Sequence, residues 1–83
     1  MVTDDIKNRV NDVLTEQLGI SSDRGIKPED NIVDDLAADE LDSIEICMSL
    51  EEEFGFAIPE EDWEDIKTVQ EIYDYIAKRE KNG

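Results

Sequence analysis

The residues of this chain that could take part in chemistry gather in one acidic segment, Asp35 to Glu45, and just beyond it. The possible nucleophiles are Ser43 and Cys47, but the chain contains no histidine, and no nucleophile–base pair is recognisable. Helical spacing places both side chains on the core-facing side of their helix, where a cysteine is normally inert packing. The sequence therefore predicts a protein that is not an enzyme.

The elements that position this segment belong to one small domain, residues 1–83. The first helix is expected from about Thr3, a suitable N-cap, to Leu18, with Gly19 as the C′ residue. Its buried face is predicted to hold Ile6, Val10, Val13, Leu14 and Leu18.

A long connection, residues 19–38, follows the first helix, and it contains no strand pattern. Loops of this length in compact domains are usually functional or held down. We expect its apolar residues to tether it to the core, namely Ile20, Ile26, Ile32, Val33 and Leu36.

Two further helices are predicted near the carboxyl end. Pro59 suits the first position of a short helix that ends near Asp65. The segment Thr68–Glu71 matches a capping box and opens a helix that runs to about Lys78. The predicted fold class is all-α, a small four-helix bundle with a short third helix and a long loop between helices 1 and 2.

The second helix, expected between the N-cap Asp39 and Gly55, carries two apolar faces. The core stripe holds Ile46, Cys47, Leu50 and Phe54. A separate line, about 130° away around the helix, holds Leu41, Ile44 and Met48. Either this line packs against another helix, or it is exposed among carboxylates as a docking surface. The acids around it favour docking.

The net charge is −16, from 24 acids and eight bases. The acids concentrate between Glu29 and Asp65, whereas five of the eight bases lie near the two ends. This distribution favours basic protein partners and argues against nucleic acid or anionic lipid. The segment Asp30 to Asp35 lacks the glycine and terminal glutamate of an EF-hand loop, so no dedicated metal site is predicted.

The cellular setting is predicted from what the sequence lacks. The first residues have no basic and apolar signal segment, and no apolar run approaches the ~20 residues that cross a bilayer. The single cysteine, Cys47, cannot form an intramolecular disulfide. We therefore expect a cytoplasmic monomer that does not insert into membranes.

The segment Asp35–Leu41 resembles the Asp-Leu-Gly-x-Asp-Ser-Leu signature of acyl carrier proteins. Further matches at the family's spacing are Asp39-x-Leu41-Asp42, Glu45, Met48, Leu50 to Phe54, Ile58-Pro59, Thr68-Val69 and Asp74 to Ile76. With Gln17 to Gly19, the similarity to bacterial carriers of dissociated fatty-acid synthesis covers almost the whole chain. It implies a four-helix bundle.

The resemblance also implies which proteins this chain meets. Its partners would be the basic surfaces of fatty-acid synthesis enzymes and of a phosphopantetheinyl transferase. The implied partner contacts are Asp39, Leu41, Asp42, Ile44, Glu45, Met48, Glu51 and Glu52. The implied lining of an acyl-chain cavity is Cys47, Leu50, Phe54 and Ile58.

Glu40 stands where the family has the serine that receives 4′-phosphopantetheine. A carboxylate at this position would form a mixed acyl phosphate, which hydrolyses readily, in place of a lasting phosphodiester. We therefore expect no cofactor on the chain as written, and 4′-phosphopantetheine if position 40 were serine. Ala37, where the family usually has glycine, is a second departure.

Three origins of Glu40 stay open: a substitution that locks a carrier in its unmodified form, natural divergence to a regulatory or interaction protein, and a sequence variant or error. The intact partner face favours a carrier that has lost its loading group. Outside the family, the chief alternative is an acidic decoy that occupies a basic DNA-binding surface. The apolar line at Leu41, Ile44 and Met48 argues against a decoy, because a phosphate mimic would present mainly charge.

Overall fold

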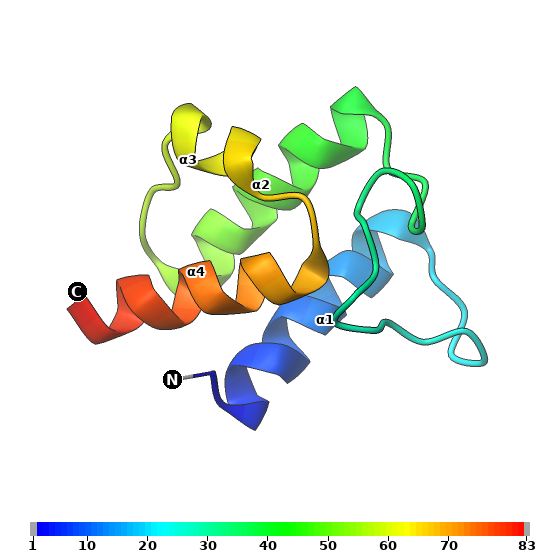
Figure 1. Cartoon of the computed structure of the whole chain (residues 1–83), viewed down its shortest axis with the longest axis horizontal. Coiled ribbons are helices and arrows are strands. Elements are labelled where there is room, and N and C mark those ends of the chain that lie inside the picture. The colour runs from blue at the N-terminus through cyan, green and yellow to red at the C-terminus, as the bar shows by residue number, and fades with distance from the viewer. Residues whose placement is uncertain (1, 83) are drawn as a thin grey trace.

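The computed structural model describes residues 2–82, which fold into a bundle of helices (Figure 1). In chain order the helices are α1 (Asp4–Leu18), α2 (Glu40–Phe54), α3 (Glu60–Asp65) and α4 (Val69–Asn82). Over residues 2–82 the only β-type pairing is an isolated bridge between Asn31 and Thr68. The predicted all-α class, with a short third helix and a long loop between the first two helices, is confirmed.

The ends of the first two helices follow their capping residues. The side chain of Thr3 accepts a hydrogen bond from the first turn of α1, and Gly19 ends that helix with φ of 64°. At the start of α2, Asp39 and Asp42 each accept a hydrogen bond from the other's backbone N–H, at 2.8 and 3.2 Å. Gly55 ends α2 with φ of 77°. Both glycines adopt the left-handed conformation that a Cβ would disfavour.

Two helix boundaries differ from the prediction. Pro59 precedes α3 and is not its first residue, because its ψ of 145° is extended. Its carbonyl accepts the first hydrogen bonds of the helix, from Asp62 and Trp63. The last helix, α4, continues to Asn82 and does not end near Lys78. Lysine, arginine and glutamate are good helix formers, and no breaker occurs in this segment to stop it.

The core lies where α1, α2 and α4 meet (Figure 1). Its largest fully buried side chains are Val10, Leu14, Ile46, Leu50, Val69, Ile72, Tyr73 and Ile76. On α1 the predicted face is confirmed: Ile6, Val10 and Leu14 are buried, while Val13 and Leu18 pack at its edge. Only one side of α2 packs against this core.

The long connection between α1 and α2 is tied down in its middle. Asp30 is buried, and its carboxylate accepts hydrogen bonds from the Arg24 guanidinium at 2.9 and 3.2 Å and from the Lys27 backbone N–H at 2.9 Å. These bonds, that of Arg24 foremost, lower the pKa of the Asp30 carboxyl. The Asp30 carbonyl accepts a further bond, 3.0 Å, from the Val69 N–H at the start of α4. The loop is thus a fixed support for the start of α2.

The predicted tethers of this loop are confirmed with one exception. Four of them are buried or half-buried against the core: Ile20, Ile26, Ile32 and Leu36. Val33 is 59% exposed, so its predicted role as a tether is wrong. The Asn31 side chain accepts hydrogen bonds from the backbone N–H groups of Val33 and Asp34, and this turn directs Val33 outward.

Candidate functional site

The exposed side of α2 presents a line of large apolar side chains. Leu41, Ile44 and Met48, here called the outer ridge, are 63%, 50% and 59% exposed. On the same helix, Ile46 and Leu50 are completely buried. The ridge residues follow each other at intervals of three and four, so they form one line along the helix. Their predicted exposure is confirmed, and exposed apolar clusters of this kind are typical of binding surfaces.

Carboxylates surround the outer ridge, and some of them also bond within the fold. Asp39 and Asp42 cap α2, so their positions are held by the backbone. Glu45 accepts a hydrogen bond from the side chain of Gln17 on α1. Glu52 is exposed. The acids predicted to meet partners therefore lie around the ridge, several of them fixed in place by the fold.

Glu51 differs from the other predicted partner contacts in its placement. It is half-buried, and its carboxylate accepts a hydrogen bond of 2.7 Å from the backbone N–H of Ile58. This bond joins α2 to the segment that leads into α3. Glu51 thus stabilises the fold, a role that helical spacing along α2 alone does not indicate.

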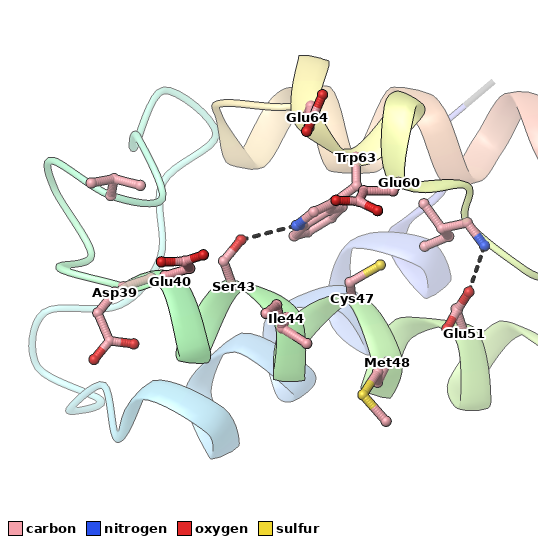
Figure 2. A pocket seen from close by; sticks show the side chains of 13 residues that line it. Asp39, Glu40, Ser43, Ile44, Cys47, Met48, Glu51, Glu60, Trp63 and Glu64 are labelled. Carbon is pink, nitrogen blue, oxygen red and sulfur yellow. Dashed lines mark hydrogen bonds between the residues drawn. The ribbon is translucent and has the colours of Figure 1, made fainter.

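A cavity of about 690 Å³ opens between α2 and α3, and the ridge residues Ile44 and Met48 form part of its wall (Figure 2). Its apolar walls are formed by Val33, Ala38, Ile44, Cys47, Met48, Ile58 and Trp63. Its polar lining consists of Asp39, Glu40, Ser43, Glu51, Glu60 and Glu64. Pockets that hold small molecules measure roughly 300–1,000 Å³, so this cavity is large enough for a ligand.

Two of the four residues predicted to line an acyl-chain cavity lie on this one, Cys47 and Ile58. Leu50 does not line it, because it is completely buried in the core. Phe54 packs instead beneath Arg9 of α1, whose guanidinium carbon lies 4.4 Å from the ring centroid. Helical spacing puts these side chains on one broad face, but Leu50 packs into the core and Phe54 packs against Arg9, so neither lines the cavity.

Trp63 lines the cavity although no role was predicted for it. It projects from α3, and its Nε1–H donates a hydrogen bond of 2.9 Å to the Ser43 hydroxyl on α2 (Figure 2). The six residues of α3 are too few for periodicity to indicate a buried face. The available signal was composition, since one tryptophan stands in an otherwise acidic segment, Glu60–Asp65.

The two possible nucleophiles of α2 lie in surroundings that do not activate them. Burial raises the pKa of the Cys47 thiol to about 11, and the charge of Glu51 adds to this effect. Such a thiol is almost entirely protonated at neutral pH. The Ser43 hydroxyl accepts its hydrogen bond from the Trp63 indole N–H, which is a donor and cannot act as the general base that a nucleophilic serine requires.

Glu40 and Ala37 lie at the start of α2, where the sequence departs from the signature that it resembles. Glu40 is the first residue of the helix, is exposed and lines the mouth of the cavity. Ala37 has φ of 60° and, over residues 2–82, is the only non-glycine residue with a positive φ. A Cβ in this region costs roughly 1–2 kcal/mol. The glycine of the signature would adopt this conformation without strain, whereas Ala37 adopts it at a cost in stability.

The acids in the described part of the chain, residues 2–82, are not clustered as metal ligands are. No group of three or more His, Cys, Asp or Glu side chains there is arranged to hold a metal ion. None of the helices formed by residues 2–82 has the length and apolar character needed to cross a membrane.

Comparisons with known proteins agree with this geometry. The family described as "Phosphopantetheine attachment site" matches residues 8–76. An acyl carrier protein of Chlorobium phaeovibrioides is 47% identical over 79 residues, which are 95% of this chain and 100% of the relative. An acyl carrier protein of Bdellovibrio bacteriovorus is 46% identical over 76 residues, 92% of this chain and 96% of the relative. This chain belongs to the acyl carrier protein family.

Solved structures of two other proteins share the fold of this acyl carrier protein family member. A protein assigned as an acyl carrier protein from Anaplasma phagocytophilum superposes with a TM-score of 0.86 at 32% identity, over 95% of this chain and 92% of the other. One from Mycobacterium tuberculosis gives a TM-score of 0.82 at 34% identity, over 89% and 97% of the two chains. The bundle that carries the outer ridge and the cavity thus has the fold of these acyl carrier proteins.

Proposed function

We propose that this member of the acyl carrier protein family docks onto basic surfaces of fatty-acid synthesis enzymes, and that in this form it does not accept 4′-phosphopantetheine. The role is non-catalytic, and the protein acts as a cytoplasmic monomer. The observation that carries the docking proposal is the exposure of Leu41, Ile44 and Met48 on a helix otherwise rich in acids.

The charge of the docking side supports basic partners. Between Lys27 and Lys67 the sequence contains no lysine, arginine or histidine, and α2 and α3 both lie in this stretch. Lysine and arginine on a partner would relieve the repulsion among these carboxylates and would speed association. The proposed contacts are Asp39, Leu41, Asp42, Ile44, Glu45, Met48, Glu51 and Glu52. In this arrangement the ridge supplies apolar anchors and the acids orient the partner.

The chemistry at position 40 supports the second part of the proposal. Attachment of phosphopantetheine needs a hydroxyl that can form a stable phosphodiester, whereas Glu40 offers a carboxylate. The next hydroxyl along α2 is Ser43, which is half-buried and hydrogen-bonded to Trp63. The residues at the start of this helix therefore do not fit a covalently attached arm.

Intact-mass spectrometry tests the attachment proposal. Incubation with coenzyme A and a phosphopantetheinyl transferase should leave the mass unchanged, whereas the variant Glu40→Ser should gain one phosphopantetheine. A mass gain on the unsubstituted protein would overturn the proposal. If this gain disappeared in Ser43→Ala, the group would be attached at Ser43. If several transferases fail on Glu40→Ser, the chain is better described as a diverged interaction protein of the same fold.

A capture assay tests the docking proposal. The immobilised protein should retain purified fatty-acid synthesis enzymes at low salt and release them as salt rises, because screening weakens charge attraction. The acidic stretch between Lys27 and Lys67 also suits a decoy of nucleic acid. A decoy would instead retain nucleases or transcription regulators, and substitutions in the outer ridge would not affect that retention.

A further inference from the structure

We propose that the cavity between α2 and α3 binds a single-chain aliphatic amine without a covalent bond, its alkyl chain inside and its protonated amine among the carboxylates at the mouth (Figure 2). This inference rests on the proposed function, because a chain that is not attached at position 40 must be held by contacts alone. The expected ligand differs from a tethered acyl group in carrying a positive head.

The walls of the cavity suit an alkyl chain. Ile58 is buried and Cys47 half-buried, whereas Val33, Ile44 and Met48 are 59%, 50% and 59% exposed. A bound chain would remove apolar surface of these exposed side chains from water, and burial of such surface drives association. The outward orientation of Val33, which does not serve the core, places its side chain on the cavity wall.

The mouth of the cavity favours a positive head group. The exposed acids on the lining whose carboxylates do not cap α2 are Glu40, Glu60 and Glu64, whereas the Asp39 carboxylate accepts the Asp42 N–H. Within the described part of the chain, no lysine or arginine is among the lining residues. Charges of one sign around a partly apolar cleft add to a field that attracts counter-ions. The same carboxylates repel a fatty-acid anion, so of two ligands with equal chains the amine binds more tightly.

Trp63 contributes to the site and provides its reporter. Its N–H is engaged with Ser43, which fixes the ring beside the cavity. An indole ring attracts a cation that approaches its face. Because the chain has a single tryptophan, intrinsic tryptophan fluorescence reports on this cavity alone.

A fluorescence titration at pH 7, below the micelle-forming concentration of each probe, tests the ligand class. Dodecylamine is protonated at this pH, since alkylammonium groups have a pKa of about 10.4. We expect it to bind about tenfold more tightly than dodecanol, with dodecanoate weakest. Ethylamine carries the same charge without the chain and should give no saturable change. Equal or tighter binding of dodecanoate, or an equal response to ethylamine, would overturn the inference.

Two charge-matched double variants separate this site from general attraction to an acidic protein. Glu60→Gln with Glu64→Gln removes two carboxylates from the mouth, and Glu61→Gln with Glu80→Gln removes two from exposed positions that do not line the cavity. We expect the first pair to weaken the binding of dodecylamine about fivefold and to leave the binding of dodecanol unchanged. The second pair should change the affinity for either ligand by less than about twofold. Equal weakening of dodecylamine by both pairs would contradict a defined site.

A series of amines with eight, ten and twelve carbons tests whether the chain enters the cavity. Each added methylene should tighten binding about two- to fourfold if it is buried. Cys47→Phe, which fills part of the cavity, should weaken all three amines while circular dichroism remains unchanged. If the three amines bound with equal affinity, the inference would be overturned, whether or not Cys47→Phe folds. The titrations use protein without any attached group, so a mass gain in the transferase assay would overturn the proposed function separately.

Discussion

The helix α2 carries aliphatic side chains on two faces, and the bundle covers only one of them. Ile46 and Leu50 on the inner face are completely buried, whereas the outer ridge, beginning at Leu41, remains at least half exposed. The inner face meets the long helices α1 and α4 at the core. On the other side α3 has only six residues, and a cavity lies between it and α2. Apolar spacing alone therefore does not distinguish a face that stabilises the fold from one available to a partner.

The largest expected contrast between the two faces is in stability. Leu50→Ala should lower the free energy of unfolding by about 2–5 kcal/mol, because it leaves a cavity in the core. Leu41→Ala deletes the same atoms from the outer ridge and should change stability by less than about 0.5 kcal/mol. Urea denaturation followed by circular dichroism measures both. Comparable losses for the two variants would show that the outer face is covered in solution.

Cys47 lies between the two faces of α2 and is half-buried. The reactivity of its thiol measures how well this position is protected from solvent. With a pKa of about 11, its thiol should react with iodoacetamide at pH 8 about a hundredfold more slowly than a free cysteine. The rate should keep rising with pH until about pH 11, as the thiolate forms. The same protein in urea serves as the control and should react as a free thiol. Rapid alkylation of the folded protein at pH 8 would contradict the burial of this position.

The outer ridge should affect binding where the inner face affects folding. Ile44→Ser is expected to weaken capture of a purified fatty-acid synthesis enzyme about tenfold, because it removes an apolar anchor. Its free energy of unfolding should change by less than about 0.5 kcal/mol. Ala57→Ser, at an exposed position outside the ridge, is the control and should bind as the parent does. Unchanged binding of Ile44→Ser would remove the ridge from the docking surface.

Glu51 and Glu52 allow a hydrogen-bonded acid to be compared with an exposed acid at the next position. Glu51→Gln should destabilise the fold by about 0.5–1 kcal/mol, because it weakens the hydrogen bond to the Ile58 N–H. Glu52→Gln removes the same charge from an exposed position and should be neutral or slightly stabilising, since it relieves repulsion. Thermal unfolding of both variants measures the difference. If the two behaved alike, the bond from Glu51 would have no energetic role.

The smallest effect is expected at Ala37, which precedes α2 and is part of neither of its faces. Ala37→Gly should raise the free energy of unfolding by about 0.5 kcal/mol, because relief of the left-handed strain exceeds the added freedom of the unfolded chain. Ala57→Gly, at a position without positive φ, should lower it by a similar amount. Capture of partner enzymes should not change in either variant. Destabilisation by Ala37→Gly would show that the alanine is preferred at this position.

Most of the fold could be predicted because its determinants are local. The caps Thr3 and Asp39 begin their helices and Gly19 and Gly55 end theirs, as expected from residues a few positions apart. The two faces of α2 also follow from spacing within one helix. The predicted end of α4 near Lys78 is wrong, because no residue between Lys78 and Asn82 stops a helix.

The sequence by itself determined the helices, their caps, the charge and the two apolar lines of α2, since each depends on neighbours along the chain. Only the tertiary structure decided that no helix of residues 2–82 covers the outer line, that Val33 faces outward, and that Trp63 lines a cavity beside Ser43. These features join segments that are distant in sequence. Their relative placement follows from packing of the whole core, which local periodicity does not specify.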